Sequence, residues 1–99
     1  MITGKQRSYL RKLAQELDPV VYIGKAEMTD NVLKEMDNLL SSRELIKVKL
    51  QEGSLLDPKA AANEAAEILN AEFVQAIGRR FVLYRQAEDP EKRLITLPR

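Results

Sequence analysis

The feature that most constrains the fold is a short apolar run that stops at a glycine, with the start of a helix close behind. Residues 20–23 read Val-Val-Tyr-Ile, Gly24 and Lys25 follow, and Thr29 opens an amphipathic pattern. This order predicts a strand, a short loop and a helix. Such a junction can place backbone N–H groups and the positive end of a helix in front of a phosphate. A plain connecting turn looks the same in sequence, so both interpretations stay open here.

Helical periodicity is present in three segments. Thr3 and Gln6 form a capping-box pattern, and the helix they begin should end at Asp18-Pro19, because a residue before proline disfavours the helical conformation. Thr29 is the expected N-cap of a second helix, and Asp57-Pro58 begins a third that runs to about Asn70. The expected buried stripes are Leu10, Leu13, Ala14 and Leu17; Val32, Leu33, Met36, Leu39 and Leu40; and Ala62, Ala65, Ala66 and Leu69.

Strand patterns occupy the intervals between these helices. Residues 45–50 alternate, with Ile46, Val48 and Leu50 on one face and Lys47 and Lys49 on the other. Residues 19–24 read as a strand flanked closely on both sides, because they are almost continuously apolar. Residues 72–77 and 80–85 predict a hairpin around Gly78, which can supply the positive φ of a tight turn. A polar turn region at 86–92 and a short final strand at 94–97 complete the chain.

The resulting order is α-β-α-β-α-β-β. We therefore expect one α/β domain of two-layer, α+β-like type over residues 1–99, with a mixed four-stranded sheet and three helices. Its crossover connections require parallel pairing in part of the sheet, closed by an antiparallel hairpin. If successive strands progress in one direction, the second and third helices cover one sheet face. Lys47 and Lys49 then lie on the other.

Composition excludes several functional classes. With 99 residues, 44% hydrophobic and 31% charged, the chain is long enough for one modest core. It has no cysteine and no histidine, so disulfides, thiol chemistry and the commonest general base and metal ligand are absent. We expect no enzyme activity, no cofactor and no metal site. No apolar run approaches a membrane span and the N-terminus lacks a secretory pattern, so we expect a cytoplasmic protein without membrane contacts.

Net charge is only +1, but the charges are segregated along the chain. Residues 1–25 hold five basic residues against two acids, and residues 78–99 hold six against three. Residues 27–37 hold four acids and one lysine, and residues 52–72 hold five acids and one lysine. This distribution can build one positive face, or the charges can solvate separate surfaces.

Nucleic-acid binding is the function that uses most of these features together. The candidate phosphate contacts are basic residues on the first helix, the loop, the second strand and the hairpin: Lys5, Arg7, Arg11, Lys12, Lys25, Lys47, Lys49, Arg79, Arg80 and Arg85. Tyr22 and Tyr84 are possible platforms for base stacking, although a strand tyrosine is more often part of the core. An exposed strand kept soluble by lysine is the alternative explanation for Lys47 and Lys49.

Taken together, five blocks give the chain a resemblance to a known family. They are residues 3–11 (TGKQRSYLR), 19–25 (PVVYIGK), 44–50 (ELIKVKL), 74–85 (VQAIGRRFVLYR) and 97–98 (LP). In order and spacing they resemble the bacterial YhbY-type proteins of the CRM (chloroplast RNA splicing and ribosome maturation) domain class. The resemblance implies a fold similar to the C-terminal domain of translation initiation factor three. It also implies a non-catalytic protein that binds RNA of the assembling large ribosomal subunit.

The family signature is a Gly-x-x-Gly loop between the first strand and the second helix. Gly24, Lys25 and Ala26 match its first three places and become candidate RNA contacts, but Glu27 stands where the second glycine belongs. A glutamate adds a side chain and a negative charge, which opposes phosphate.

The partner predicted by the resemblance is the ribosomal RNA precursor of the large subunit, with ribosomal proteins as further candidates. We expect the protein itself to be a monomer. The alternative is a protein-interaction module that binds a ribosomal protein or an assembly factor.

Overall fold

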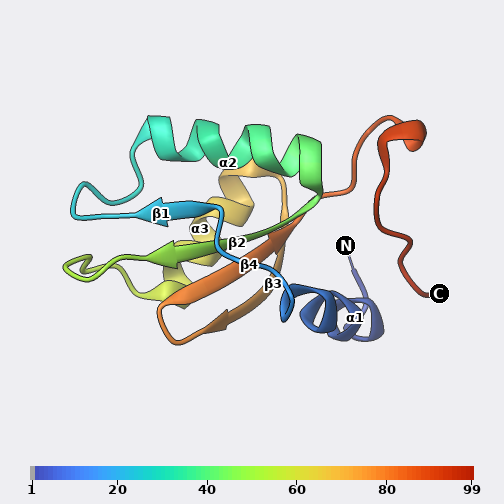
Figure 1. Cartoon of the computed structure of the whole chain (residues 1–99), viewed down its shortest axis with the longest axis horizontal. Helices are drawn as coiled ribbons and strands as arrows, with labels where there is room; N and C mark the ends of the chain where they lie inside the picture. The colour runs from blue at the N-terminus through green and yellow to red at the C-terminus, as the bar shows by residue number, and fades with distance from the viewer. Residues whose placement is uncertain (1) are drawn as a thin grey trace.

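The computed structural model describes residues 2–99, and its elements follow the predicted order (Figure 1). The elements are α1 Gly4–Ala14, β1 Val21–Ile23, α2 Asp30–Arg43, β2 Leu45–Leu50, α3 Pro58–Leu69, β3 Glu72–Ile77, β4 Arg80–Tyr84 and a 3-10 turn at Pro90–Lys92. Three helices and a mixed four-stranded sheet form this compact α/β fold, as expected. No helix within residues 2–99 is long and apolar enough to cross a membrane.

The helix starts form where the sequence predicts them, because each has a side chain that accepts a hydrogen bond from the first turn. Thr3 and Gln6 form a complete capping box at α1. Thr29 Oγ1 accepts from the N–H of Val32 at α2, and Asp57 Oδ2 accepts from the N–H of Ala60 at α3. These bonds satisfy N–H groups that have no partner inside the helix.

The sheet has the strand order β1-β2-β4-β3. β1 pairs in parallel with β2, while β4 lies antiparallel between β2 and β3. The crossover from β2 through α3 to β3 therefore leaves one position open between β2 and β3. The hairpin strand β4 occupies this position. A bulge between Phe73 and Gln75 interrupts the pairing of β3 with β4.

Two hydrophobic clusters form on opposite faces of the sheet. α2 and α3 cover one face, where Ile46, Val48 and Leu50 of β2 pack with Phe81 and Leu83 of β4. This confirms that α2 and α3 share a face. On the opposite face α1 contributes Leu10 and Ala14 to a smaller cluster, which also contains Leu45, Val74, Val82 and Tyr84. Lys47 and Lys49 lie on this α1 side, because they alternate with the buried residues of β2.

Three expectations are corrected. α1 ends at Ala14 rather than at Asp18, because the turn that follows is tightened by bonds such as Leu17 N–H to Ala14 C=O (3.0 Å). β1 spans Val21–Ile23 and is an edge strand, so the prediction that it is flanked on both sides is wrong. Residues 94–97 form no strand. Instead, the Glu44 carboxylate accepts the backbone N–H groups of Leu94 and Ile95.

Candidate nucleic-acid interface

Three loops gather at one end of the sheet, at the left of Figure 1. They are the β1–α2 loop, the β2–α3 loop and the tip of the β3–β4 hairpin, and we call this region the loop end. Backbone bonds hold the loops together: Gln51 N–H donates to Ile23 C=O and Leu50 N–H donates to Arg79 C=O, each at 2.8 Å. The carboxyl ends of the parallel strands β1 and β2 therefore lie beside the hairpin turn.

The β1–α2 loop is a tight turn, and its geometry bears on the Gly-x-x-Gly pattern that the resemblance implies at this place. Glu27 N–H donates to Gly24 C=O at 3.0 Å, which closes a four-residue turn over Lys25 and Ala26. Glu27 then adopts a φ of 63°, in the left-handed region that disfavours residues with a side chain. The backbone thus keeps at position 27 a conformation that suits glycine, although a glutamate occupies it.

Two cations are positioned at the loop end by packing and hydrogen bonding. The aliphatic stem of Lys25 lies against Gly53, where a Cβ atom would come within 3.1 Å of Lys25 Cε. Arg79 donates from Nη2 to the backbone carbonyl of Ser54 at 2.9 Å and so ties the hairpin to the β2–α3 loop. The close approach at Gly53 and this carbonyl bond were not predicted, because both join segments far apart in sequence.

Lys49 and Arg80 lie directly behind the loop end, on the α1 side of the sheet. They are Cα partners across β2 and β4. The only ion pair within residues 2–99 joins Arg85 to Asp37, so no carboxylate of the described chain lies within 4.0 Å of either cation. Lys25 likewise has no carboxylate within 4.0 Å among the described residues. Among the predicted cations at or directly behind the loop end, these three make neither an ion pair nor a side-chain hydrogen bond within residues 2–99.

Other predicted site residues bond to the protein backbone. Lys47 donates from Nζ to Leu17 C=O at 2.9 Å and holds the segment that follows α1. Arg7 and Arg11 on α1 donate from Nε to the carbonyls of Phe73 (3.0 Å) and Val74 (3.4 Å), beside the bulge of the edge strand β3. The side chains of Lys5 and Lys12 on α1 make no hydrogen bond within the described residues.

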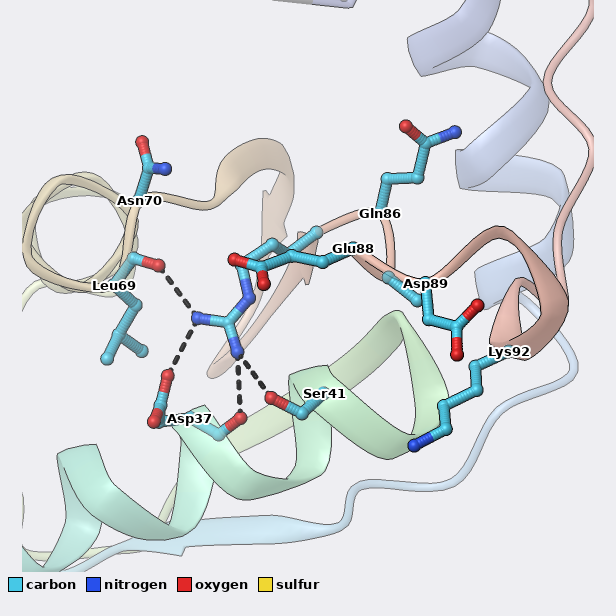
Figure 2. Close-up of a pocket in the computed structure, with 10 residues that line it drawn as sticks. Asp37, Ser41, Leu69, Asn70, Gln86, Glu88, Asp89 and Lys92 are labelled. Carbon is cyan, nitrogen blue, oxygen red and sulfur yellow. Dashed lines mark hydrogen bonds and ion pairs between the residues drawn. The ribbon is translucent and has the colours of Figure 1, made fainter.

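Arg85 lies away from the other candidates, between α2 and α3. Its guanidinium donates to the Asp37 carboxylate and the Leu69 carbonyl at 2.8 Å, and to the Asp37 carbonyl and Ser41 Oγ at 2.9 Å. Figure 2 shows these partners converging from both helices. Arg85 therefore joins α2 to the end of α3 on the side of the sheet opposite Lys49 and Arg80.

The two tyrosines considered for base stacking differ in exposure. Tyr22 on β1 is 50% exposed, on the α1 side of the sheet. Tyr84 is only 2% exposed and belongs to the cluster under α1, so its ring is unavailable to a ligand. Burial raises the pKa of the Tyr84 hydroxyl, and the nearby Glu44 carboxylate raises it further. That hydroxyl has no hydrogen-bond partner among the described residues.

Comparison with known proteins gives relatives over the full length of the chain. The "Probable RNA-binding protein YqeI" of Bacillus subtilis is 36% identical over 98 residues, covering 99% of this chain and 100% of the relative. A protein of Haemophilus influenzae named "RNA-binding protein" is 38% identical, covering 99% and 96%. The solution structure of the hypothetical protein SAV1595 from Staphylococcus aureus matches with a TM-score of 0.81 and 41% identity, covering 99% and 100%.

The fold and the loop end together define an α/β domain with a glycine-containing turn between its first strand and second helix. The model of the CRS1/YhbY (CRM) domain matches residues 2–85. The chain belongs to this family.

Proposed function

We propose that this protein is a non-catalytic RNA-binding protein, and that its target is ribosomal RNA of the assembling large ribosomal subunit. Family membership and the names of the relatives support RNA as the ligand. We further propose that residues 1–99 act as one monomeric domain in the cytoplasm, with ribosomal proteins as possible neighbours on the same particle.

The observation that carries the proposal is a group of three cations at and directly behind the loop end that form no ion pair within residues 2–99. Lys25, Lys49 and Arg80 come from three different elements and lack a carboxylate partner within residues 2–99. Neighbouring cations without ion-pair partners repel one another in the free protein, and a phosphate backbone relieves this repulsion while releasing its own counterions. Gly24 and Ala26 shape the turn that presents Lys25, and Arg79 extends the positive charge onto the hairpin.

The remaining candidate residues are expected to contribute to RNA binding to different degrees. Lys5 and Lys12 are exposed on α1 and extend the positive surface away from the loop end. Arg7 and Arg11 use only Nε in their bonds to β3, so their Nη groups remain for phosphate. Lys47 supports the segment after α1 through its ammonium group, and Arg85 stabilises the helix layer. We expect these last two to affect RNA binding only through the fold.

The test is a salt titration of RNA affinity with charge-neutralising variants. Fluorescence anisotropy with a large-subunit ribosomal RNA fragment would compare the wild type with Lys25→Gln, Lys49→Gln and Arg80→Gln. Each variant should weaken binding and lower the slope of log affinity against log salt by about 0.7 to 0.9 for each lost phosphate contact. Lys92→Gln is the matched control, because Lys92 is an exposed cation in the 3-10 turn at the opposite end of the molecule (Figure 1).

Three variants with wild-type affinity and slope would overturn the proposal. Crosslinking in cells followed by RNA sequencing tests the ribosomal target, and recovery of other RNA classes in its place would contradict that assignment. An association with ribosomal particles that survives nuclease and high salt would instead favour a protein-interaction module.

A further inference from the structure

A single row of side chains crosses the sheet on the α1 side, immediately behind the loop end. Tyr22 is the Cα partner of Lys49, Lys49 is the partner of Arg80, and Arg80 is the partner of Ile77. The row therefore takes one residue from each of the four strands. Because the side chains of directly paired residues leave a sheet on the same face, all four belong to one surface.

α1 does not cover this row. Its contacts on the sheet reach Leu45, Val74, Val82 and Tyr84, which lie nearer the opposite end of the strands. In Figure 1 α1 lies beside one end of the sheet, and the end that carries the loops extends beyond it. Tyr22 is 50% exposed and Ile77 is 66% exposed, while Arg80 is exposed and Lys49 is half-buried.

The composition of the row is unfavourable for a surface that faces only water. Like charges directly opposite each other on neighbouring strands destabilise a sheet. Here Lys49 and Arg80 are such a pair, without a carboxylate within 4.0 Å among residues 2–99. A large aromatic ring and an aliphatic side chain stand exposed at the two sides of this pair. A ligand that offers negative charge together with flat apolar faces would satisfy all four side chains.

We propose that the row binds a single-stranded segment of RNA, with a base stacked on the Tyr22 ring and the backbone phosphates on Lys49 and Arg80. This inference rests on the proposed RNA-binding function and specifies the form of RNA that the sheet takes. Neighbouring strands lie about 4.8 Å apart, so Tyr22 and Arg80 are separated by about 10 Å across the sheet. Ile77 lies one strand further on and provides an apolar contact for a base or a ribose.

Single-stranded RNA fits this surface better than a duplex, because a paired base keeps its faces inside the helical stack. An unpaired base can leave the stack and lie on an aromatic ring, as in other RNA-binding sheets. The row is also continuous with the loop end, since Gly24 and Lys25 follow Tyr22 by two and three residues along the chain. A strand that crosses the sheet can therefore continue onto Lys25.

The experiment compares one RNA sequence in single-stranded form and as a duplex with its complement. Tyr22→Val removes the ring but keeps a β-branched residue that suits a strand, and Tyr22→Phe keeps the ring. We expect Tyr22→Val to weaken binding of the single strand about 5- to 150-fold, the range for one lost base stack, with an unchanged salt slope. Duplex affinity should not change, and Tyr22→Phe should bind both forms like the wild type. Tyr9→Val is the matched control, because Tyr9 is a partly exposed tyrosine on α1 outside the row.

Lys49→Gln and Arg80→Gln provide a second test that does not depend on Tyr22. Each should lower the salt slope for the single strand by about 0.7. If Tyr22→Val weakens neither form of RNA, or both equally, the stacking proposal is overturned while RNA binding stands. If a glutamate oligomer displaces the single strand equally well from wild type and Tyr22→Val, the row is a site for acidic protein segments. If the wild type binds no RNA even at low salt, the proposed function itself fails.

Discussion

The carboxylate of Glu44 accepts a hydrogen bond of 2.7 Å from the backbone N–H of Leu94, fifty residues further along the chain. It also accepts from the N–H groups of Ala87 at 2.6 Å and Ile95 at 3.0 Å. Glu44 is completely buried at the end of α2, with a positive φ of 67°. One side chain thus attaches the C-terminal segment, which has no strand or long helix of its own, to the body of the domain.

Replacing Glu44 should therefore destabilise the protein. Glu44→Ala leaves three N–H groups without their acceptor and should lower the free energy of unfolding by about 3 kcal/mol. Glu44→Gln keeps one oxygen acceptor and should cost less. Urea denaturation followed by circular dichroism would measure both. Equal stability of Glu44→Ala and wild type would show that water replaces the carboxylate without loss.

Glu27→Gly should tighten RNA binding, about 2- to 5-fold, because it removes a negative charge from the loop end. The substitution also removes the strain of a left-handed residue, about 1 kcal/mol, although the greater freedom of glycine in the unfolded chain offsets part of this gain. RNA affinity and thermal denaturation should be measured together.

Glu27→Asn separates the two effects on the loop. Asparagine is neutral and tolerates the left-handed region, so it should give most of the gain in affinity if charge is the cause. An affinity that rises with glycine but not with asparagine would attribute the effect to the close approach of the backbone instead.

Arg85→Lys should destabilise the fold without changing RNA affinity per folded molecule. A lysine cannot reproduce the forked donors that reach Asp37, Ser41 and Leu69 together, so we expect a loss of about 2 kcal/mol. The bonds to carbonyl and hydroxyl groups account for most of this, because Asp37 is 51% exposed and water screens the ion pair. A large drop in RNA affinity with intact stability would place Arg85 in the interface.

Tyr84 should make the protein less stable in alkali. Its pKa is raised by burial and by Glu44, so the unfolded chain loses the phenolic proton first as pH rises. Stability is fully present below the ordinary tyrosine pKa of about 10 and falls as pH rises from there toward the raised value. Tyr84→Phe removes this titration and a buried hydroxyl that has no hydrogen-bond partner among residues 2–99. The melting temperature of Tyr84→Phe should therefore exceed that of the wild type by more at alkaline pH than at neutral pH. An equal difference at the two pH values would contradict this prediction.

Much of the fold could be predicted because its signals are local. The caps at Thr3, Thr29 and Asp57 act within a single turn of helix, and the alternation of residues 45–50 follows from strand geometry. The 94–97 prediction failed because the position of this segment depends on a contact with a distant residue. That segment is held by Glu44, a residue far away in sequence whose side chain carries no local signal of this role.

The sequence by itself determined the order of the elements, the family and the basic residues from which an interface could be built. Only the tertiary structure decided which of those residues are available. Arg85 and Lys47 carry the same charge as Arg80 and Lys49. The first two bond to the protein, whereas the other two have no ion-pair partner within residues 2–99 and lie in a row with Tyr22. The physical reason is that a cation's partners are set by strand pairing and helix packing between distant segments, which its own neighbours in sequence do not specify.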